Sequence, residues 1–370
     1  MVKVLHILSA TSASRGDMVV VMNYFKHIDK SGVSFDFAKM QECKDNIDDE
    51  LISLGGKTFF FEKPGLKNWK RSVDKLIEII NVGNYDVVHL HVPVIQWFVK
   101  KAMKSCKCKN LIIHSHSTKL SSKFLNRIRN RFLILNINKN LSGRFACSKE
   151  AGLKLFGKSF GKKENDYVIN NAIDLKKYKF NVEEFKTTRQ ELGVSNETVS
   201  VCHVGRFSNE KNHDRLIDIF NELYKKDNKF KLFLIGDGPL RPAMEEKVKN
   251  LGLTEQVSFL GNRKDVPKLL KGMDIFLFTS LFEGLGLSLI EAQAAGLLCF
   301  SSDACPEESK KTENVYRVSL AETNKFWCDL IFEKHLLGWN RNTSADIEEQ
   351  NYGIETEANK LLSIYNKIVK

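Results

Sequence analysis

The sequence predicts an α/β protein made of two doubly wound domains, each built on a parallel β-sheet. Apolar strand segments alternate with helical segments in two successive series, and such alternation produces parallel sheets covered by helices on both faces. The length of 370 residues also fits two domains, at roughly 150 residues each. With 42% apolar and 28% charged residues, the composition is that of a globular protein whose domains bury cores.

The first series begins with the apolar strand 2–8. The following segment 18–22 is rich in β-branched residues, but the spacing of apolar residues after it fits a buried helix better. We expect strands at 2–8, 34–38, 57–61, 87–90, 111–114 and 144–146, and helices at 17–29, 47–54, 72–81, 94–106, 123–137 and 149–156.

The second series repeats the scheme after a break near residues 168–174. No flexible linker is found there, so we expect the two halves to pack closely. The final segment 355–369 has the apolar spacing of an amphipathic helix. We expect strands at 199–204, 230–235, 257–260, 275–278 and 298–301, and helices at 213–226, 240–251, 266–271 and 287–295.

The positive charge of the chain is concentrated in one segment. The chain carries 57 Lys and Arg against 45 Asp and Glu, a net charge of +12. Between Asp86 and Glu150 there are thirteen basic residues and no acidic one, so this segment accounts for the whole surplus. Nucleic-acid binding is not expected, because the segment lacks interleaved surface aromatic residues and a known reader fold.

Within this segment, residues 119–131 have the pattern of a basic helix with Phe124, Leu125 and Ile128 on an apolar side. Such helices bind anionic membrane surfaces. We therefore expect the basic segment 100–149 to contact an anionic membrane, and a merely solvated basic face is the alternative.

The eight cysteines form no disulfide or metal-binding framework. Only Cys106 and Cys108 are close in sequence, and their spacing is tighter than that of the usual Cys-x-x-Cys pair. The N-terminus is too short and polar for a signal peptide, and no stretch of 18 apolar residues exists. We expect free thiols in a cytoplasmic protein that is soluble or peripheral on the inner face of the cytoplasmic membrane.

Loops that follow strands in the second half carry residues suited to a phosphorylated ligand. Arg206 and Lys211 are five positions apart and can close on a pyrophosphate, although a plain basic loop is the alternative. The Gly-rich loop 279–286 leads into a helix, whose free N–H groups and dipole favour phosphate. Glu283 and Glu291 lie in this loop and helix, where they can accept hydrogen bonds from hydroxyls of a sugar and a ribose. For Glu283 alone, stabilisation by the helix dipole is the alternative.

Four motifs follow one another in the second half: Gly-Arg-x-x-x-x-Lys, Gly-Asp-Gly-Pro-Leu, Gly-x-Arg-x-Asp-Val-Pro and Ser-x-x-Glu-Gly-x-x-x-x-x-x-Glu-Ala. Their order and spacing resemble the retaining family 4 glycosyltransferases of the GT-B fold, in particular bacterial members that build capsular, exopolysaccharide or lipopolysaccharide glycans. The first half fits as well, so the resemblance covers nearly the whole chain. It implies two Rossmann-like domains facing a cleft: an acceptor-side domain, 1–170 with the C-terminal helix 352–370, and a donor domain, 171–351.

The resemblance also implies the roles of individual residues. Arg206 and Lys211 match the pair that grips the donor diphosphate, while Glu283 and Glu291 match the glutamates that contact the donor sugar and the nucleotide ribose. Since the family uses no divalent metal and this chain has no Asp-x-Asp motif, positive side chains would stabilise the leaving diphosphate. The whole nucleotide-sugar site implied in this way consists of Gly16, Arg206, Lys211, Gly236, Arg263, Glu283, Gly284, Leu285, Gly286 and Glu291.

In the first half, His116 matches the family's histidine that reaches the donor sugar, and His114 is the second choice. For each of them, a hydrogen-bonded polar residue at a strand end is the alternative. The two histidines have no third partner at a recognisable spacing, so we expect no zinc and no other metal. Two features depart from the family pattern. The loop 12–17 has a single glycine, Gly16, where the family has two, and the loop 302–306 differs from the polar loop expected there.

The resulting prediction is a retaining glycosyltransferase that moves a sugar from a nucleotide-sugar, with uridine as the expected base, to a hydroxyl of a glycan or lipid-linked acceptor. The leaving diphosphate would assist deprotonation of the acceptor, with Glu283, His116, Arg206 and Lys211 as the catalytic set and no further cofactor. An NAD-dependent enzyme is disfavoured, since no Gly-x-Gly-x-x-Gly follows the first strand of either half. A non-catalytic partner of another transferase is the remaining alternative, which the atypical Gly16 loop supports and the intact glutamate and basic pairs oppose.

Overall fold

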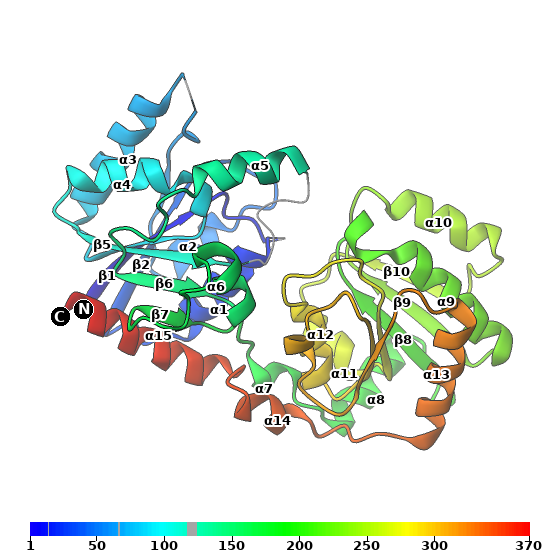
Figure 1. Cartoon of the computed structure of the whole chain (residues 1–370). Coiled ribbons are helices and arrows are strands. Elements are labelled where there is room, and N and C mark those ends of the chain that lie inside the picture. Colours follow the sequence, from blue (N-terminus) through cyan, green and yellow to red (C-terminus); the bar gives the residue numbers. More distant parts are fainter. Residues whose placement is uncertain (14, 66, 117–123) are drawn as a thin grey trace. The chain divides into compact units, whose positions relative to one another are not determined.

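The computed structural model describes residues 1–13, 15–65, 67–116 and 124–370, with the side chains of 124–127 outside the description. The chain divides into two compact units. Unit 1 comprises Met1–Ile173 and Asn351–Lys370, and unit 2 comprises Asp174–Gln350. Each unit contains one parallel sheet with helices on both faces, which confirms the predicted α/β class (Figure 1).

The sheet of unit 1 has seven strands in the order β3-β2-β1-β4-β5-β6-β7. The chain order reverses between β1 and β4, and open α/β sheets bind ligands at such a switch point. The strands are β1 (Val2–Leu8), β2 (Val33–Lys39), β3 (Thr58–Phe60), β4 (Val87–Leu90), β5 (Asn110–Ser115), β6 (Gly143–Ala146) and β7 (Asp166–Val168). The helices are α1 (Gly16–His27), α2 (Asp48–Ser53), α3 (Trp69–Gly83), the short η1 (Pro93–Ile95), α4 (Gln96–Lys104), α5 (Phe124–Leu133), α6 (Lys149–Phe156) and α15 (Ile354–Val369).

The C-terminal helix α15 packs against the sheet of unit 1, beside α1 (Figure 1). Its entry is fixed by backbone hydrogen bonds between Ile173 and the segment 352–354. Glu357 is fully buried and accepts a hydrogen bond from the backbone N–H of Asn170 (3.0 Å). The last helix therefore completes the unit that contains the N-terminus.

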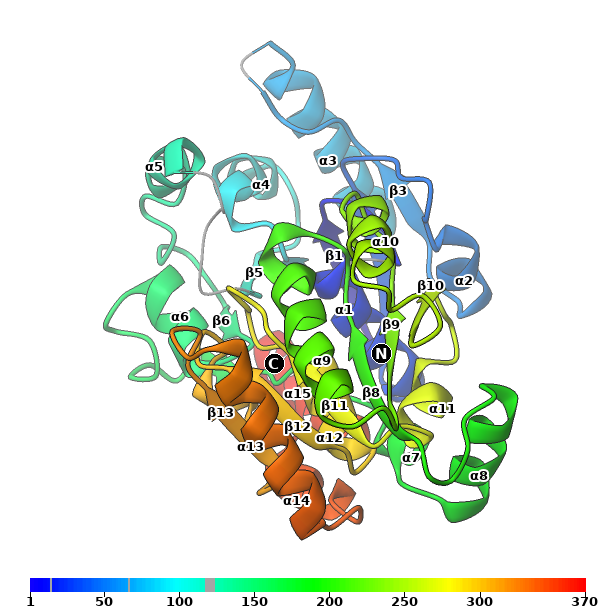
Figure 2. The ribbon, with the colours of Figure 1, turned by 90° about the vertical axis from the view of Figure 1, so that its right-hand side faces the viewer.

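The sheet of unit 2 has six strands in the order β10-β9-β8-β11-β12-β13, with its switch point between β8 and β11. Helices α9 and α13 cover one face and α11 and α12 the other (Figures 1 and 2). The strands are β8 (Val199–Val204), β9 (Phe230–Ile235), β10 (Val257–Gly261), β11 (Ile275–Phe278), β12 (Leu298–Ser302) and β13 (Val315–Val318). The helices are α7 (Leu175–Tyr178), α8 (Val182–Glu191), η2 (Asn209–Lys211), α9 (His213–Lys226), α10 (Arg241–Asn250), α11 (Val266–Lys271), α12 (Leu287–Ala294), η3 (Glu307–Ser309), α13 (Asn324–Leu337) and α14 (Ser344–Glu349).

Several elements differ from the prediction. The helix expected over 123–137 ends at Leu133, because the chain turns there and Asn136 adopts a left-handed backbone conformation (φ +59°). The helix expected over 94–106 is split into η1 and α4. The prediction also omitted β7, α7, α8, β13, α13 and α14.

The basic segment is not one uniform surface. Arg144 is buried (1% exposed) and forms a two-pronged ion pair with Asp166, outside the segment. Lys100 donates to the backbone carbonyls of Asn136 and Ile137. The expectation that residues 100–149 act together as a membrane-facing surface is therefore wrong for Arg144, whose charge is already compensated inside the protein. Lys119 and Lys123 lie outside the described residues.

The eight cysteines are unpaired thiols, and all except Cys43 are buried. Within the described part of the chain, no helix is both long and apolar enough to cross a membrane.

Candidate active site

Unit 2 places the predicted phosphate-binding residues on either side of its switch point. Arg206 and Lys211 follow β8, and the loop 279–286 follows the neighbouring strand β11. Backbone hydrogen bonds tie the two loops together, since the Leu281 N–H donates to the carbonyl of Glu210 (2.8 Å). The carboxyl ends of β8 and β11 thus form one continuous polar edge.

Lys211 and Glu283 form an ion pair across this edge. Their Nζ and Oε1 atoms are 2.7 Å apart, and the side chains are 21% and 10% exposed. The Lys211 ammonium also lies 4.9 Å from the ring centroid of buried Phe278. Because both groups are largely shielded from water, this pair is held more firmly than a surface salt bridge.

Glu291 lies on α12, and a residue of α7 is hydrogen-bonded to its side chain. The Tyr178 phenol donates a hydrogen bond to the Glu291 carboxylate, and burial raises the pKa of Glu291 above its usual value. Tyr178 is a site residue that the sequence reasoning missed, because α7 is a single helical turn without a periodic pattern.

Two of the predicted glycines adopt backbone conformations that favour glycine, and one of them is also required by close packing of two loops. A Cβ at Gly236 (φ +133°) would lie 2.1 Å from the carbonyl oxygen of Gly205. Gly286 also has a positive φ (+77°) and is the residue before α12. The α12 N-terminus that follows it presents the positive end of a helix dipole beside Gly284 and Leu285.

The remaining predicted residues of unit 2 are less tightly placed. Arg206 is exposed. Hydrogen bonds from the backbone N–H of Glu210 itself and from Ser208 lower the pKa of Glu210, and the charge of Arg206 acts in the same direction. Arg263 follows β10, which β9 separates from β8, and forms a two-pronged ion pair with Asp265 (2.7 and 2.6 Å). The structure therefore brings Lys211, Glu283 and Glu291 together at the carboxyl ends of β8 and β11. Arg263 lies two strands away from β8, after β10.

The loop after β12, for which the sequence suggested no role, packs against the same edge. The hydroxyl of Ser302 donates to the carbonyl of Ser280 (2.5 Å). Burial raises the pKa of Cys305 to about 11, and the negative charge of Glu283 acts in the same direction. This loop thus supports the loop that carries Glu283.

In unit 1, Gly16 and His116 line one cavity of about 490 Å³ at the carboxyl ends of β4 and β5. Gly16 is the first residue of α1, and a Cβ there would touch nothing within 4 Å, so side-chain size does not require this glycine. The other lining residues are Arg15, Asp17, His91, Val92, Pro93, Val94, Ser115, Asn130 and Leu155. His114, the second choice, is 3% exposed and lies beneath the cavity lining.

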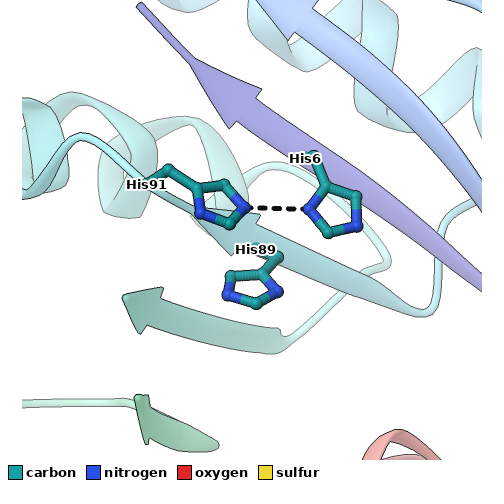
Figure 3. Close-up of side chains that lie close together, drawn as sticks. All are labelled: His6, His89 and His91. Carbon is teal, nitrogen blue, oxygen red and sulfur yellow. Dashed lines mark hydrogen bonds between the residues drawn. The ribbon is translucent and has the colours of Figure 1, made fainter. Parts of the chain in front are cut away.

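His116 belongs to a cluster of five histidines at the ends of β1, β4 and β5. Both ring nitrogens of His91 are hydrogen-bonded. Nε2 lies 2.9 Å from Nδ1 of His6 (Figure 3), and Nδ1 lies 2.7 Å from Nε2 of His116. Burial lowers the pKa of His116 to about 4 and that of His6 to about 3. The rings are therefore neutral near pH 7.

Sequence spacing did not reveal a third histidine beside His114 and His116. His91 lies close to both His114 and His116, and each of the three offers a ring nitrogen within 4.8 Å of the other two. His91 follows a different strand from His114 and His116, so sequence spacing alone could not show the third partner.

Unit 2 thus carries Lys211, two glutamates and a helix N-terminus at the switch point of a parallel sheet, an arrangement suited to a phosphorylated sugar ligand. The family model for glycosyl transferases group 1 matches residues 184–324. A putative glycosyltransferase EpsF from Bacillus subtilis (strain 168) is 31% identical over 372 residues, which cover 98% of this chain and 96% of that protein. The chain therefore belongs to the group 1 glycosyltransferase family.

A second relative and a solved structure agree with this assignment. The capsular polysaccharide biosynthesis glycosyltransferase CapH from Staphylococcus aureus is 24% identical over 365 residues, covering 94% of this chain and 96% of that protein. The crystal structure of Anabaena HepE in complex with UDP and glucose superposes with a TM-score of 0.79 at 18% identity, covering 98% of this chain and 99% of that one. This last similarity concerns the fold, which is GT-B as predicted.

Proposed function

We propose that this glycosyltransferase transfers a sugar from a UDP-sugar to a hydroxyl of a glycan or lipid-linked glycan, with retention of anomeric configuration, in surface polysaccharide synthesis. The observation that carries the proposal is the Lys211–Glu283 pair at the switch point of unit 2. The name of CapH, a capsular polysaccharide biosynthesis glycosyltransferase, and the UDP and glucose in the HepE structure support the substrate class. Unit 2 would hold the donor, and unit 1 would hold the acceptor.

The basic residues of unit 2 would stabilise the leaving nucleoside diphosphate. Arg206 is exposed and can turn toward a phosphate, and Lys211 can exchange Glu283 for a phosphate oxygen or contact both. The α12 N-terminus next to Gly284, Leu285 and Gly286 adds a fixed positive dipole. Charge stabilisation of this kind acts where negative charge develops, so the transfer would need no divalent ion on the diphosphate.

The carboxylates and His116 would orient the sugar. Glu283 would accept hydrogen bonds from sugar hydroxyls, and Glu291, held by Tyr178, from the ribose hydroxyls. His116 opens into the unit 1 cavity and would donate or accept at the sugar. In a retaining transfer the departing diphosphate oxygen can accept the proton of the acceptor hydroxyl on the same face, so no protein nucleophile is required.

The experiment that tests this proposal measures release of nucleoside diphosphate from UDP-, GDP- and ADP-sugars, with and without a lipid-linked acceptor and in the presence of EDTA. We expect release from a UDP-sugar that EDTA does not abolish. Arg206→Ala should lower kcat about 100-fold or more while the melting temperature stays within a few degrees, because the side chain is exposed. Lys264→Ala, at another exposed basic residue of unit 2, is the matched control.

Two outcomes would contradict the proposal. Normal turnover by Arg206→Ala would remove the assigned role of the basic pair. Release from no nucleotide-sugar under any condition would favour the alternative, a sugar-nucleotide-binding partner of another transferase.

We also propose that α5 and the turn after it dock on an anionic membrane, which would bring a lipid-linked acceptor to unit 1. Phe132 is 68% exposed and Leu135 61% exposed, and exposed Arg129 and Arg131 lie beside them. Exposed Trp97 (53%) lies on α4, which is joined to this region by hydrogen bonds from Gln96. Apolar side chains among arginines are the pattern of helices that lie in a membrane interface.

A further inference from the structure

Three histidines of the unit 1 cluster lie close enough together to share a metal ion, an arrangement that sugar transfer does not require. We propose that His91, His114 and His116 bind a divalent transition-metal ion of the Zn²⁺ class at the carboxyl end of the unit 1 sheet. The proposed site lies in unit 1 alone, and it shares His116 with the sugar contact of the proposed function.

The three rings are already gathered closely enough to share an ion. One ring nitrogen of each lies within 4.8 Å of the corresponding nitrogen of the others. Zinc–nitrogen bonds of about 2.0–2.1 Å in a tetrahedral site require nitrogen–nitrogen distances of about 3.4 Å. The rings of His114 and His116 are stacked at 4.1 Å between centroids, so these side chains would have to rotate to turn both nitrogens toward one ion.

The other histidines leave suitable nitrogens available. His6 is hydrogen-bonded to Nε2 of His91, and His89 lies 3.2 Å from Nδ1 of His114. The opposite nitrogens, His91 Nδ1 and His114 Nε2, are therefore the ones that could bind an ion. His114 Nε2 is buried and has no hydrogen-bond partner among the described residues. An unsatisfied buried polar atom is destabilising, and coordination of an ion would satisfy it.

The protons can be distributed consistently with coordination. Each neutral imidazole carries one N–H, so a nitrogen that binds a metal leaves the proton on the opposite nitrogen. His91 can then donate from Nε2 to His6, and His114 can donate from Nδ1 to His89, whose other nitrogen lies 2.7 Å from the Tyr365 hydroxyl. Hydrogen bonds of this kind orient metal-binding histidines in proteins.

The site also has an entrance and a free coordination position. His91 and His116 both line the 490 Å³ cavity, whereas the alternative trio His6, His89 and His91 lies deeper, among fully buried rings. In the described structure, His116 Nε2 is hydrogen-bonded to His91 Nδ1 at 2.7 Å, and an ion would replace that contact. Three protein ligands leave the fourth position of a tetrahedral ion to water.

The test is binding of Zn²⁺ and Co²⁺ to the tag-free full-length chain after washing with a chelator. We expect one tightly bound equivalent by calorimetry and elemental analysis, visible absorption bands of tetrahedral Co²⁺, and a higher melting temperature with Zn²⁺. His114→Gln and His116→Gln should lose the Co²⁺ bands and at least 10-fold in affinity. His27→Gln, which removes a histidine of unit 1 on α1 outside the cluster, should change neither.

His116→Gln is the decisive variant, because the half-buried rim position tolerates substitution even where the buried His114→Gln fails to fold. Absence of a stoichiometric ion, or equal Zn²⁺ affinity in His116→Gln and the unmodified chain, would overturn the proposal. All of these readouts are independent of sugar transfer, so they stand or fall separately from the proposed function.

Discussion

At the scale of single residues, the active-site edge of unit 2 depends on buried partners that hold charged groups in place. Glu291 is the clearest case, because its carboxylate sits in a desolvated position and accepts a hydrogen bond from Tyr178 (8% exposed). A carboxylate in such a position is costly unless its hydrogen bonds are made. Tyr178 thus acts on the ligand through Glu291 and is a positioning residue.

We predict that Tyr178→Phe raises the KM for the nucleotide-sugar about 10-fold and changes kcat much less. The phenol removed is a donor to the carboxylate assigned to the ribose, and one such hydrogen bond is worth roughly 1–1.5 kcal/mol. Steady-state kinetics with varied donor would measure this. Tyr224→Phe, on α9 of the same unit, is the control. A loss confined to kcat, or to the melting temperature, would show that Tyr178 does not act on the donor.

The sequence anticipated residues that stand in recognisable motifs, and it missed those that only folding brings together. Arg206, Lys211, Glu283 and Glu291 follow strands whose β-branched and aromatic runs are clear in the sequence. Tyr178 comes from one helical turn, and the histidine cluster comes from three strands. Contacts across strands depend on sheet order and register, which local pattern does not contain.

At the scale of secondary structure elements, segments with a strong apolar pattern were predicted correctly, and segments with a weak pattern were missed. Strand β8 and helix α9 have the predicted bounds, because each presents a clear period of apolar residues. Helix α13 was missed, since its apolar residues point both into the core, as Trp327 does, and into solvent, as Leu336 and Leu337 do. Such a helix has no single apolar stripe for a pattern to detect.

Helix α5 is the element for which membrane binding is predicted. Arg131→Glu combined with Phe132→Ser should reduce flotation with anionic liposomes at least 10-fold, because a basic residue contributes about 1 kcal/mol near such a surface and a buried aromatic ring contributes more. The control pairs Lys225→Glu with Leu336→Ser, both exposed and in unit 2. Unchanged flotation of the α5 variant, or an equal loss in the control, would remove this role.

At the scale of the whole molecule, buried neutral histidines make folding sensitive to acid. Unit 1 contains four of them and the half-buried His116, and unit 2 contains His203 and His213, which pack on each other at 4.8 Å between ring centroids. Burial lowers the pKa of all seven, that of His213 to about 4. Their concentration in unit 1 suggests that acid destabilises this unit more.

The direction in which stability changes with pH follows from the number of protons that the folded and unfolded chains bind. Unfolded histidines titrate near pH 6.5, so below that pH the unfolded chain binds more protons than the folded one, and the free energy of unfolding falls as pH falls. Each histidine contributes about 1.4 kcal/mol per pH unit until its folded pKa is reached.

We therefore predict a constant melting temperature above about pH 7 and a steep fall between pH 6.5 and 4, measured by calorimetry with EDTA present. His6→Phe, beside Phe35 and Phe37, should make that fall shallower, because it removes a group whose folded pKa is about 3. A melting temperature that stays flat from pH 7 to 5, or a slope unaffected by His6→Phe, would show that these histidines do not remain neutral in the folded protein.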